Sequence, residues 1–290
     1  MSAAVEPPVE SPRDLGTAYA LLTDAGGPPW RPIAGGTDLL VQITGEIGEQ
    51  PDRVIDLWRL DELRGITLAG DALVLGALTT YTEIRRSPVV AEFLPALVEC
   101  AATIGAAQIQ NRGTIGGNVV NASPAGDTLP ILLAAGAQFV LGSATGTRTV
   151  AADAFWTGYR ETARRHDELL LRVRIPILSD RQLRFRKVGT RRAQAISKVV
   201  MALAWRSSSD DSEWTDVRLA LGSVAPTTIR AHATEAVLEG SSPTREMADR
   251  AAAALAAEIR PIDDVRSTAD YRRAVAARVL HRLIRDEGGW

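Results

Sequence analysis

Two short glycine segments are the parts of this sequence best suited to binding chemistry. The first is AGGTD at residues 34–38, directly after an expected strand, and the second is GTIGGN at residues 113–118. Each joins two adjacent glycines to a threonine hydroxyl, so backbone N–H groups can converge on one anion without obstruction by Cβ atoms. Because neither segment contains Lys or Arg, we expect oriented amides and hydroxyls to meet the negative charge.

Each segment also has a purely structural interpretation. The first could be a tight turn in which Asp38 caps the next helix, and the second could be a glycine-rich hairpin. The common nucleotide motifs do not match, because the sequence contains no G-x-x-x-x-G-K-[ST] and no two glycines at positions i and i+2. If the two segments grip the two phosphates of a pyrophosphate, they do so on a fold other than the Rossmann fold.

Several polar residues close to the second segment have two possible roles. Asp127 could accept hydrogen bonds from a ribose or a ring N–H, or it could cap the helix that follows. Asn111, Arg112 and Asn121 could contact a ligand or stabilise the loop. The basic cluster FRKVGTRR at residues 185–192 could be a solvated face or part of a site.

Composition excludes several classes of protein. The 290 residues carry 33 basic and 35 acidic side chains, a net charge of -2, which argues against nucleic acid as a partner. No apolar run is long enough to predict a membrane span, and the N-terminus lacks signal-peptide features, so we expect a cytoplasmic protein. The single cysteine excludes a Cys-ligated cluster within the chain, and three dispersed histidines predict no metal site.

The pattern of elements predicts two domains after a disordered lead at residues 1–10. We expect residues 11–178 to form one domain and residues 181–290, with strands followed by helices, to form an α+β module. A capping box at Thr80–Glu83 predicts a helix start, and a second helix is expected at Val89–Ala102. Residues 103–127 are poor in large apolar side chains and are expected to form a long irregular, functional loop.

Four stretches together resemble a known family, and the resemblance covers nearly the whole chain. They are PIAGGTDLL (residues 32–40), TIGGNVVNASPAGD (114–127), ELLLRVRIP (168–176) and FRKVGTRRAQAISKV (185–199). In these stretches the sequence resembles the FAD-binding medium subunit of molybdenum hydroxylases, which include the flavoprotein subunits of xanthine dehydrogenase and carbon monoxide dehydrogenase.

The resemblance implies an α+β fold, with a two-subdomain FAD-binding region of the vanillyl-alcohol-oxidase (PCMH) type and a C-terminal α+β domain. It implies that FAD contacts both glycine segments, the expected strand at 168–176 and the C-terminal domain. It also implies that Ile104 lies near the adenine or ribose side of the cofactor. The implied FAD-binding residues are Pro32, Ile33, Ala34, Gly35, Gly36, Thr37, Asp38, Leu39, Ile104, Gly113, Thr114, Ile115, Gly116, Gly117, Asn118, Asp127, Leu170, Lys187 and Ile196. Since no histidine lies in either glycine segment, we expect noncovalent FAD.

The resemblance also implies a place in a larger enzyme. A small [2Fe–2S] subunit and a large molybdopterin subunit would be partners, as a dimer of heterotrimers, and electrons would leave the clusters through FAD to an external acceptor. The molybdenum cofactor and the clusters would lie only on those partners. Two alternatives stay open: a stand-alone flavin-dependent oxidoreductase of the same fold, and a non-catalytic scaffold. Activity of the chain alone with a small substrate would favour the first, and failure to bind FAD would favour the second.

Overall fold

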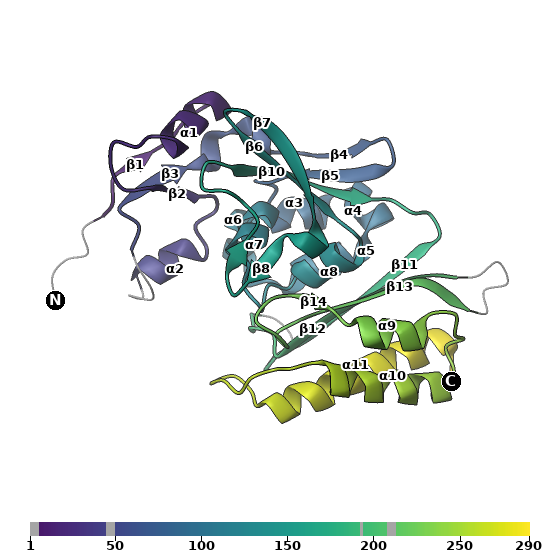
Figure 1. The fold of residues 1–290 in the computed structure, drawn as a ribbon. Coiled ribbons are helices and arrows are strands. Elements are labelled where there is room, and N and C mark those ends of the chain that lie inside the picture. The colour runs from purple at the N-terminus through teal and green to yellow at the C-terminus, as the bar shows by residue number, and fades with distance from the viewer. Residues whose placement is uncertain (1–5, 45–49, 192–193, 208–212) are drawn as a thin grey trace.

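The computed structural model describes residues 6–44, 50–191, 194–207 and 213–290 (Figure 1). The chain begins with a small parallel sheet in the order β1-β3-β2. Its strands are β1 (Val9–Glu10), β2 (Trp30–Ile33) and β3 (Arg53–Asp56), and its helices are α1 (Leu15–Leu22) and α2 (Leu39–Thr44).

The disordered lead expected at residues 1–10 is wrong at its C-terminal end. Val9 and Glu10 pair with Val54 and Ile55 of β3, so they form part of the sheet. The physical reason is a long-range strand partner, which local composition does not reveal. Residues 1–5 lie outside the described part of the chain.

A five-stranded antiparallel sheet forms the centre of the first domain, in the order β4-β5-β10-β6-β7. Its strands are β4 (Ile66–Ala69), β5 (Ala72–Gly76), β6 (Gln138–Ser143), β7 (Gly146–Ala151) and β10 (Leu169–Pro176). The central strand β10 is the apolar strand expected at residues 168–176, and Leu169, Val173 and Ile175 are buried in it. A hairpin of β8 (Trp156–Gly158) and β9 (Glu161–Thr162) lies beside this sheet.

Six short helices form a layer between this sheet and the C-terminal sheet (Figure 1). They are α3 (Tyr81–Arg86), α4 (Pro88–Phe93), α5 (Pro95–Thr103), α6 (Ala107–Arg112), α7 (Ile115–Asn121) and α8 (Leu129–Ala134). The capping box that predicts the start of α3 is confirmed, because Glu83 N–H donates to Thr80 Oγ1 at 3.2 Å and Thr80 N–H donates to Glu83 Oε2 at 2.6 Å.

Two helix expectations are wrong. The single helix expected at Val89–Ala102 is divided into α4 and α5, because Leu94, which precedes Pro95, leaves the helical backbone region at φ -147° and ψ 60°. The irregular loop expected at residues 103–127 contains α6 and α7. Adjacent glycines have low helix propensity and conceal α7, although Thr114 caps it by accepting from Gly117 N–H.

The C-terminal domain is a sheet covered by helices, as expected for an α+β module. Its antiparallel strands, in the order β11-β12-β13-β14, are β11 (Arg181–Val188), β12 (Val199–Ser207), β13 (Trp214–Gly222) and β14 (Ile229–Arg230). Helices α9 (His232–Leu238), α10 (Arg245–Glu258) and α11 (Ala269–Gly288) cover the outer face (Figure 1). Within the described residues, no helix is long and apolar enough to cross a membrane.

Successive side chains of β12 point to opposite faces of the sheet, and each face packs against a different domain core. Met201 and Leu203 pack into the core beneath α10 and α11, whereas Val200, Ala202 and Ala204 pack into the core of the first domain. One sheet therefore belongs to two hydrophobic cores, and the α+β architecture places the C-terminal domain firmly against the helix layer.

Candidate functional site

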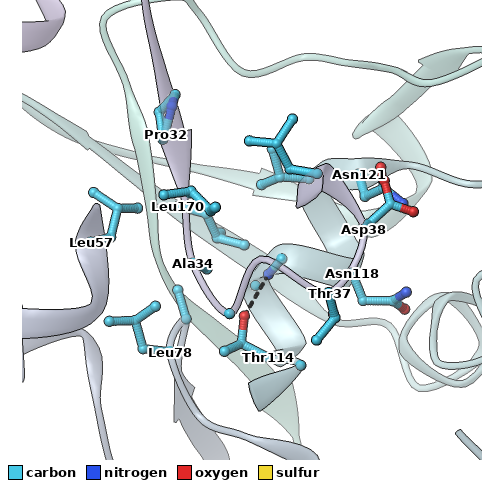
Figure 2. Close-up of a pocket in the computed structure, with 18 of the residues that line it drawn as sticks. Pro32, Ala34, Thr37, Asp38, Leu57, Leu78, Thr114, Asn118, Asn121 and Leu170 are labelled. Carbon is cyan, nitrogen blue, oxygen red and sulfur yellow. Dashed lines mark hydrogen bonds between the residues drawn. The ribbon is translucent and has the colours of Figure 1, made fainter. Parts of the chain in front are cut away.

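The two glycine segments meet at a single cavity of about 380 Å³. The first segment passes the N-terminal end of α7, which carries the second (Figure 2). A Cβ atom on Gly35 would lie 1.6 Å from the carbonyl oxygen of Arg112, so only glycine permits this backbone contact. The segments are far apart in sequence, yet they form adjoining walls of one cleft.

The first segment presents unused backbone donors. Among the described residues, no group accepts from the N–H of Gly35, Gly36 or Thr37. Gly36 has φ 76°, a conformation that favours glycine. This turn after β2 therefore has the free amides that an anion-binding loop needs.

The second segment differs from the expectation that its backbone also forms such a cup. The N–H of Ile115 donates to Thr79 O and that of Gly116 to Ala77 O, both at 2.9 Å. The N–H of Gly117 donates to Thr114 Oγ1 at 3.0 Å (Figure 2). The expectation is wrong for these three amides, because the start of α7 docks on carbonyl groups that follow β5.

The contribution of the second segment comes from its side chains and its small surface. Asn118 Oδ1 accepts from Thr128 Oγ1 at 2.5 Å, and no described group accepts from its NH₂. Gly117 lacks a side chain on the cavity wall, where a Cβ atom would lie 3.9 Å from that of Ala34. The NH₂ group of Asn118 is therefore a further donor on the cavity wall.

Apolar side chains form another part of the cavity wall. Leu57, Leu78 and Leu170 line it together with Pro32 (Figure 2), and Ile104 also lines it. The strand β10 positions Leu170, whereas Leu57 and Leu78 come from short connections that carry no motif in the sequence. Such a wall suits the face of an aromatic ring system.

Fifteen of the residues implied by the resemblance line the cavity. They are Pro32, Ile33, Ala34, Gly35, Gly36, Thr37, Asp38, Leu39, Ile104, Gly113, Thr114, Gly116, Gly117, Asn118 and Leu170. Ile115 instead lies fully buried in the hydrophobic core. Ile196 has 54% of its surface exposed and does not line this cavity.

Asp127 and Lys187 form a buried pair close to the cavity without lining it. Lys187 Nζ lies 2.6 Å from Asp127 Oδ2 and donates to Thr103 O at 3.2 Å, next to cavity-lining Ile104. Ser197 Oγ donates to the other carboxylate oxygen. Burial raises the pKa of Asp127, and the positive charge of Lys187 and the two hydrogen bonds oppose that rise.

Three arginines were not found by sequence reasoning. Arg31, Arg160 and Arg164 line the cavity, outside both glycine segments. Arg31 lies just before the first segment but carries no motif that marks it as a ligand. Arg160 and Arg164 are distant from the glycines in sequence, and the turn that places Arg160 at φ 56° is visible only in the structure. Asn121, whose role stayed open in the sequence, also lines the cavity.

Free amides, guanidinium groups and an apolar wall in one cleft suit a nucleotide that carries both phosphates and an aromatic ring system. Comparison with protein families identifies the nucleotide. Residues 4–178 match the family described as the FAD binding domain in molybdopterin dehydrogenase, and residues 184–286 match the CO dehydrogenase flavoprotein C-terminal domain. The chain belongs to this flavoprotein family. It is therefore an FAD-binding subunit of the oxidoreductase class.

Curated relatives are similar in sequence to this flavoprotein over most of its length. The carbon monoxide dehydrogenase medium chain of Hydrogenophaga pseudoflava is 35% identical over 280 residues, which cover 94% of each chain. The glyceraldehyde dehydrogenase medium chain of Sulfolobus acidocaldarius is 33% identical, over 84% of this chain and 86% of the relative.

Solved structures show the same fold. Carbon monoxide dehydrogenase from Hydrogenophaga pseudoflava lacking the Mo-pyranopterin moiety matches with a TM-score of 0.91 and 34% identity, over 97% of this chain and 96% of that chain. Quinoline 2-oxidoreductase from Pseudomonas putida 86 matches with a TM-score of 0.91 and 26% identity, over 99% of this chain and 98% of that chain.

The geometry fits FAD. The free amides of residues 35–37 suit a diphosphate, because Gly35 removes the side chain that would separate the two segments. The apolar side chains of Pro32, Leu57 and Leu170 suit a flat ring. Both kinds of surface line one cavity, as a dinucleotide requires.

Proposed function

We propose that this chain is the FAD-binding subunit of a heteromeric molybdenum hydroxylase. Its place would be between the [2Fe–2S] clusters of a small partner subunit and an external electron acceptor. A large partner subunit would carry the molybdenum cofactor, where the organic or inorganic substrate is oxidised. The complex would be a dimer of such heterotrimers.

One observation supports this proposal most strongly. Segments around Gly35 and Gly117 are far apart in sequence, yet they line the same cavity, and they approach closely at Gly35 because only glycine permits that backbone contact. The carbon monoxide dehydrogenase medium chain is covered over 94% of its length and its enzyme has the same fold, which supports a role as one subunit among several.

We propose that the residues of this chain bind and orient the cofactor. The free N–H groups of Gly35, Gly36 and Thr37 would donate to the diphosphate, with Asn118 as a further donor from the adjoining segment. Leu57 and Leu170 would exclude water from a ring face. Bound FAD would supply one-electron and two-electron redox chemistry. The attachment would be noncovalent, since neither glycine segment contains histidine.

The Asp127–Lys187 pair and Ile196 would act at the side of the cofactor nearest the C-terminal domain. Lys187, on β11, donates to the carbonyl oxygen of Thr103, which precedes the cavity-lining residue Ile104. We propose that the carboxylate and the ammonium group exchange part of their mutual contact for hydrogen bonds to the flavin ring. This arrangement would put the reactive end of FAD at the junction of the two domains.

Purification of the affinity-tagged full chain from its native cells tests the proposal. We expect two further chains to copurify, with flavin, iron and molybdenum in fixed ratios, and we expect substrate to bleach the flavin absorbance only in this complex. A flavin-containing chain that purifies alone and is reduced directly by a small substrate would favour the stand-alone oxidoreductase. A chain without flavin would contradict the proposal and favour a scaffold.

A further inference from the structure

We propose that Arg31, Arg160 and Arg164 form a cationic wall that binds the diphosphate of the dinucleotide by charge. This inference rests on the proposed function, because it assigns FAD to this cavity. It changes one expectation from the sequence, namely that amides and hydroxyls alone would meet the negative charge. We call these three residues the arginine wall.

The formal charges of the cavity lining favour a doubly charged anion. Three arginines and one aspartate, Asp38, line the cavity, and the other described lining residues carry no formal charge. The lining therefore has a formal charge of +2. A diphosphate linkage has two phosphates with about one negative charge each, so the charges are complementary.

Arg160 lies between the two glycine segments. Its Nη1 donates to Asn121 Oδ1 at 2.8 Å, at the end of α7, and lies 3.5 Å from Asp38 Oδ2, at the end of the first segment. The side chains of Arg160 and Asp38 are 39% and 47% exposed. Exposed ion pairs contribute little stability, so Arg160 can exchange Asp38 for a phosphate at small cost.

A turn with positive φ positions Arg160 beside the end of α7. Arg160 is the second residue of the two-residue turn between β8 and β9 and has φ 56°, where glycine is favoured. The hairpin is fixed on α7 because Trp156 Nε1 donates to Val119 O at 3.0 Å. The fold thus holds an arginine over the glycine segments in a backbone conformation that disfavours it.

The guanidinium groups of Arg164 and Arg31 form no ion pair with a carboxylate in the part of the chain that the structure describes. Arg164 donates to the carbonyl oxygens of Arg165 and Glu168, at 2.8 Å and 2.7 Å. Burial and, after it, the charge of Arg31 lower the pKa of Arg164. The side chain of Arg31 makes no hydrogen bond or ion pair with any described residue, whereas its backbone belongs to the β2–β3 ladder. Two like charges facing one cavity are stabilised when an anion joins them, and guanidinium groups bind phosphate in a bidentate manner.

The test is the affinity of the full chain for FAD at low and high ionic strength, measured by flavin fluorescence. We expect Arg160→Gly and Arg31→Gln each to weaken FAD binding about tenfold at low salt, the size of one charge-assisted contact. The difference from wild type should shrink at about 1 M salt, where the Debye length is about 3 Å. Arg250→Gln, on the outer helix α10, is the matched control and should leave the affinity unchanged.

Thermal unfolding without FAD separates binding from folding. Arg160→Gly should unfold at the same temperature as wild type or higher, because glycine relieves the positive φ. Wild-type affinity in both arginine variants at low salt would overturn the inference, as would a loss of affinity that high salt does not reduce. If the wild-type chain itself binds no FAD, the proposed function fails, which is a different result.

Discussion

At the scale of single residues, Gly35 is the position where the site depends most on the absence of a side chain. Replacing it with alanine places a Cβ atom 1.6 Å from Arg112 O, so the two segments must separate. We expect Gly35→Ala to lose FAD binding and about 1–3 kcal/mol of stability, as overpacking does. Isothermal titration and urea unfolding measure both effects.

Gly27→Ala is a suitable control for Gly35→Ala. Its added Cβ would meet only the flexible side chain of Arg53, at 3.3 Å. FAD affinity should stay at the wild-type value. If Gly35→Ala also retained wild-type affinity, the close backbone contact would have no role in the site.

The buried pair Asp127–Lys187 gives a second prediction at this scale. The two side chains are 10% and 6% exposed, so Lys187→Met leaves a buried carboxyl group without its cation. The pKa of Asp127, already raised by burial, should rise further. We expect a loss of about 3–5 kcal/mol in the free energy of unfolding at neutral pH.

A double variant tests whether that loss comes from the unpaired charge. Asp127→Asn combined with Lys187→Met removes both charges and should recover part of the stability, as denaturant unfolding would show. Equal losses in the single and double variants would mean that packing, not charge, explains the effect.

At the scale of elements, Glu168 fixes the loop that leads into β10. Its carboxylate accepts from Arg148 Nε at 2.6 Å, on β7, and from Arg165 N–H at 2.7 Å. These hydrogen bonds, that from Arg148 first, lower the pKa of Glu168 below its ordinary value of 4.5. Glu168→Gln should therefore cost about 1–2 kcal/mol at neutral pH, since Arg148 is a third exposed.

The pH dependence of that cost has a definite sign. A carboxyl group with a lowered pKa in the folded state stabilises the protein above its unfolded pKa, and this stabilisation is lost as the pH falls through the folded pKa. The gap between wild type and Glu168→Gln should be full at pH 7 and should shrink below about pH 4.5. A gap that stays constant down to pH 3 would contradict this account.

Sequence patterns predict elements well where the signal is local. The apolar run of β10 and the capping box of α3 depend on neighbouring residues, and both are confirmed. The helix α7 was missed because its glycines serve tertiary contact, with Gly116 against Ala77. The arginine wall was also missed. Arg160 and Arg164 come to the first glycine segment from a distant part of the chain, and no motif separates Arg31, just before that segment, from the other arginines.

At the scale of the whole molecule, the two domains share the sheet of β11 to β14. Because alternate residues of β12 enter both cores, we expect the chain to unfold in one cooperative transition. Circular dichroism and intrinsic tryptophan fluorescence should give the same midpoint. Two separate transitions would show that the domains are stable independently.

The central claim is that the cavity between the glycine segments holds one FAD. Titration of the flavin-free full chain with FAD, followed by flavin fluorescence and by thermal unfolding, tests it most directly. The account predicts saturation at one FAD per chain and a rise in the unfolding temperature, because a ligand that binds only the folded state stabilises it. A flat titration with an unchanged unfolding temperature would contradict the account.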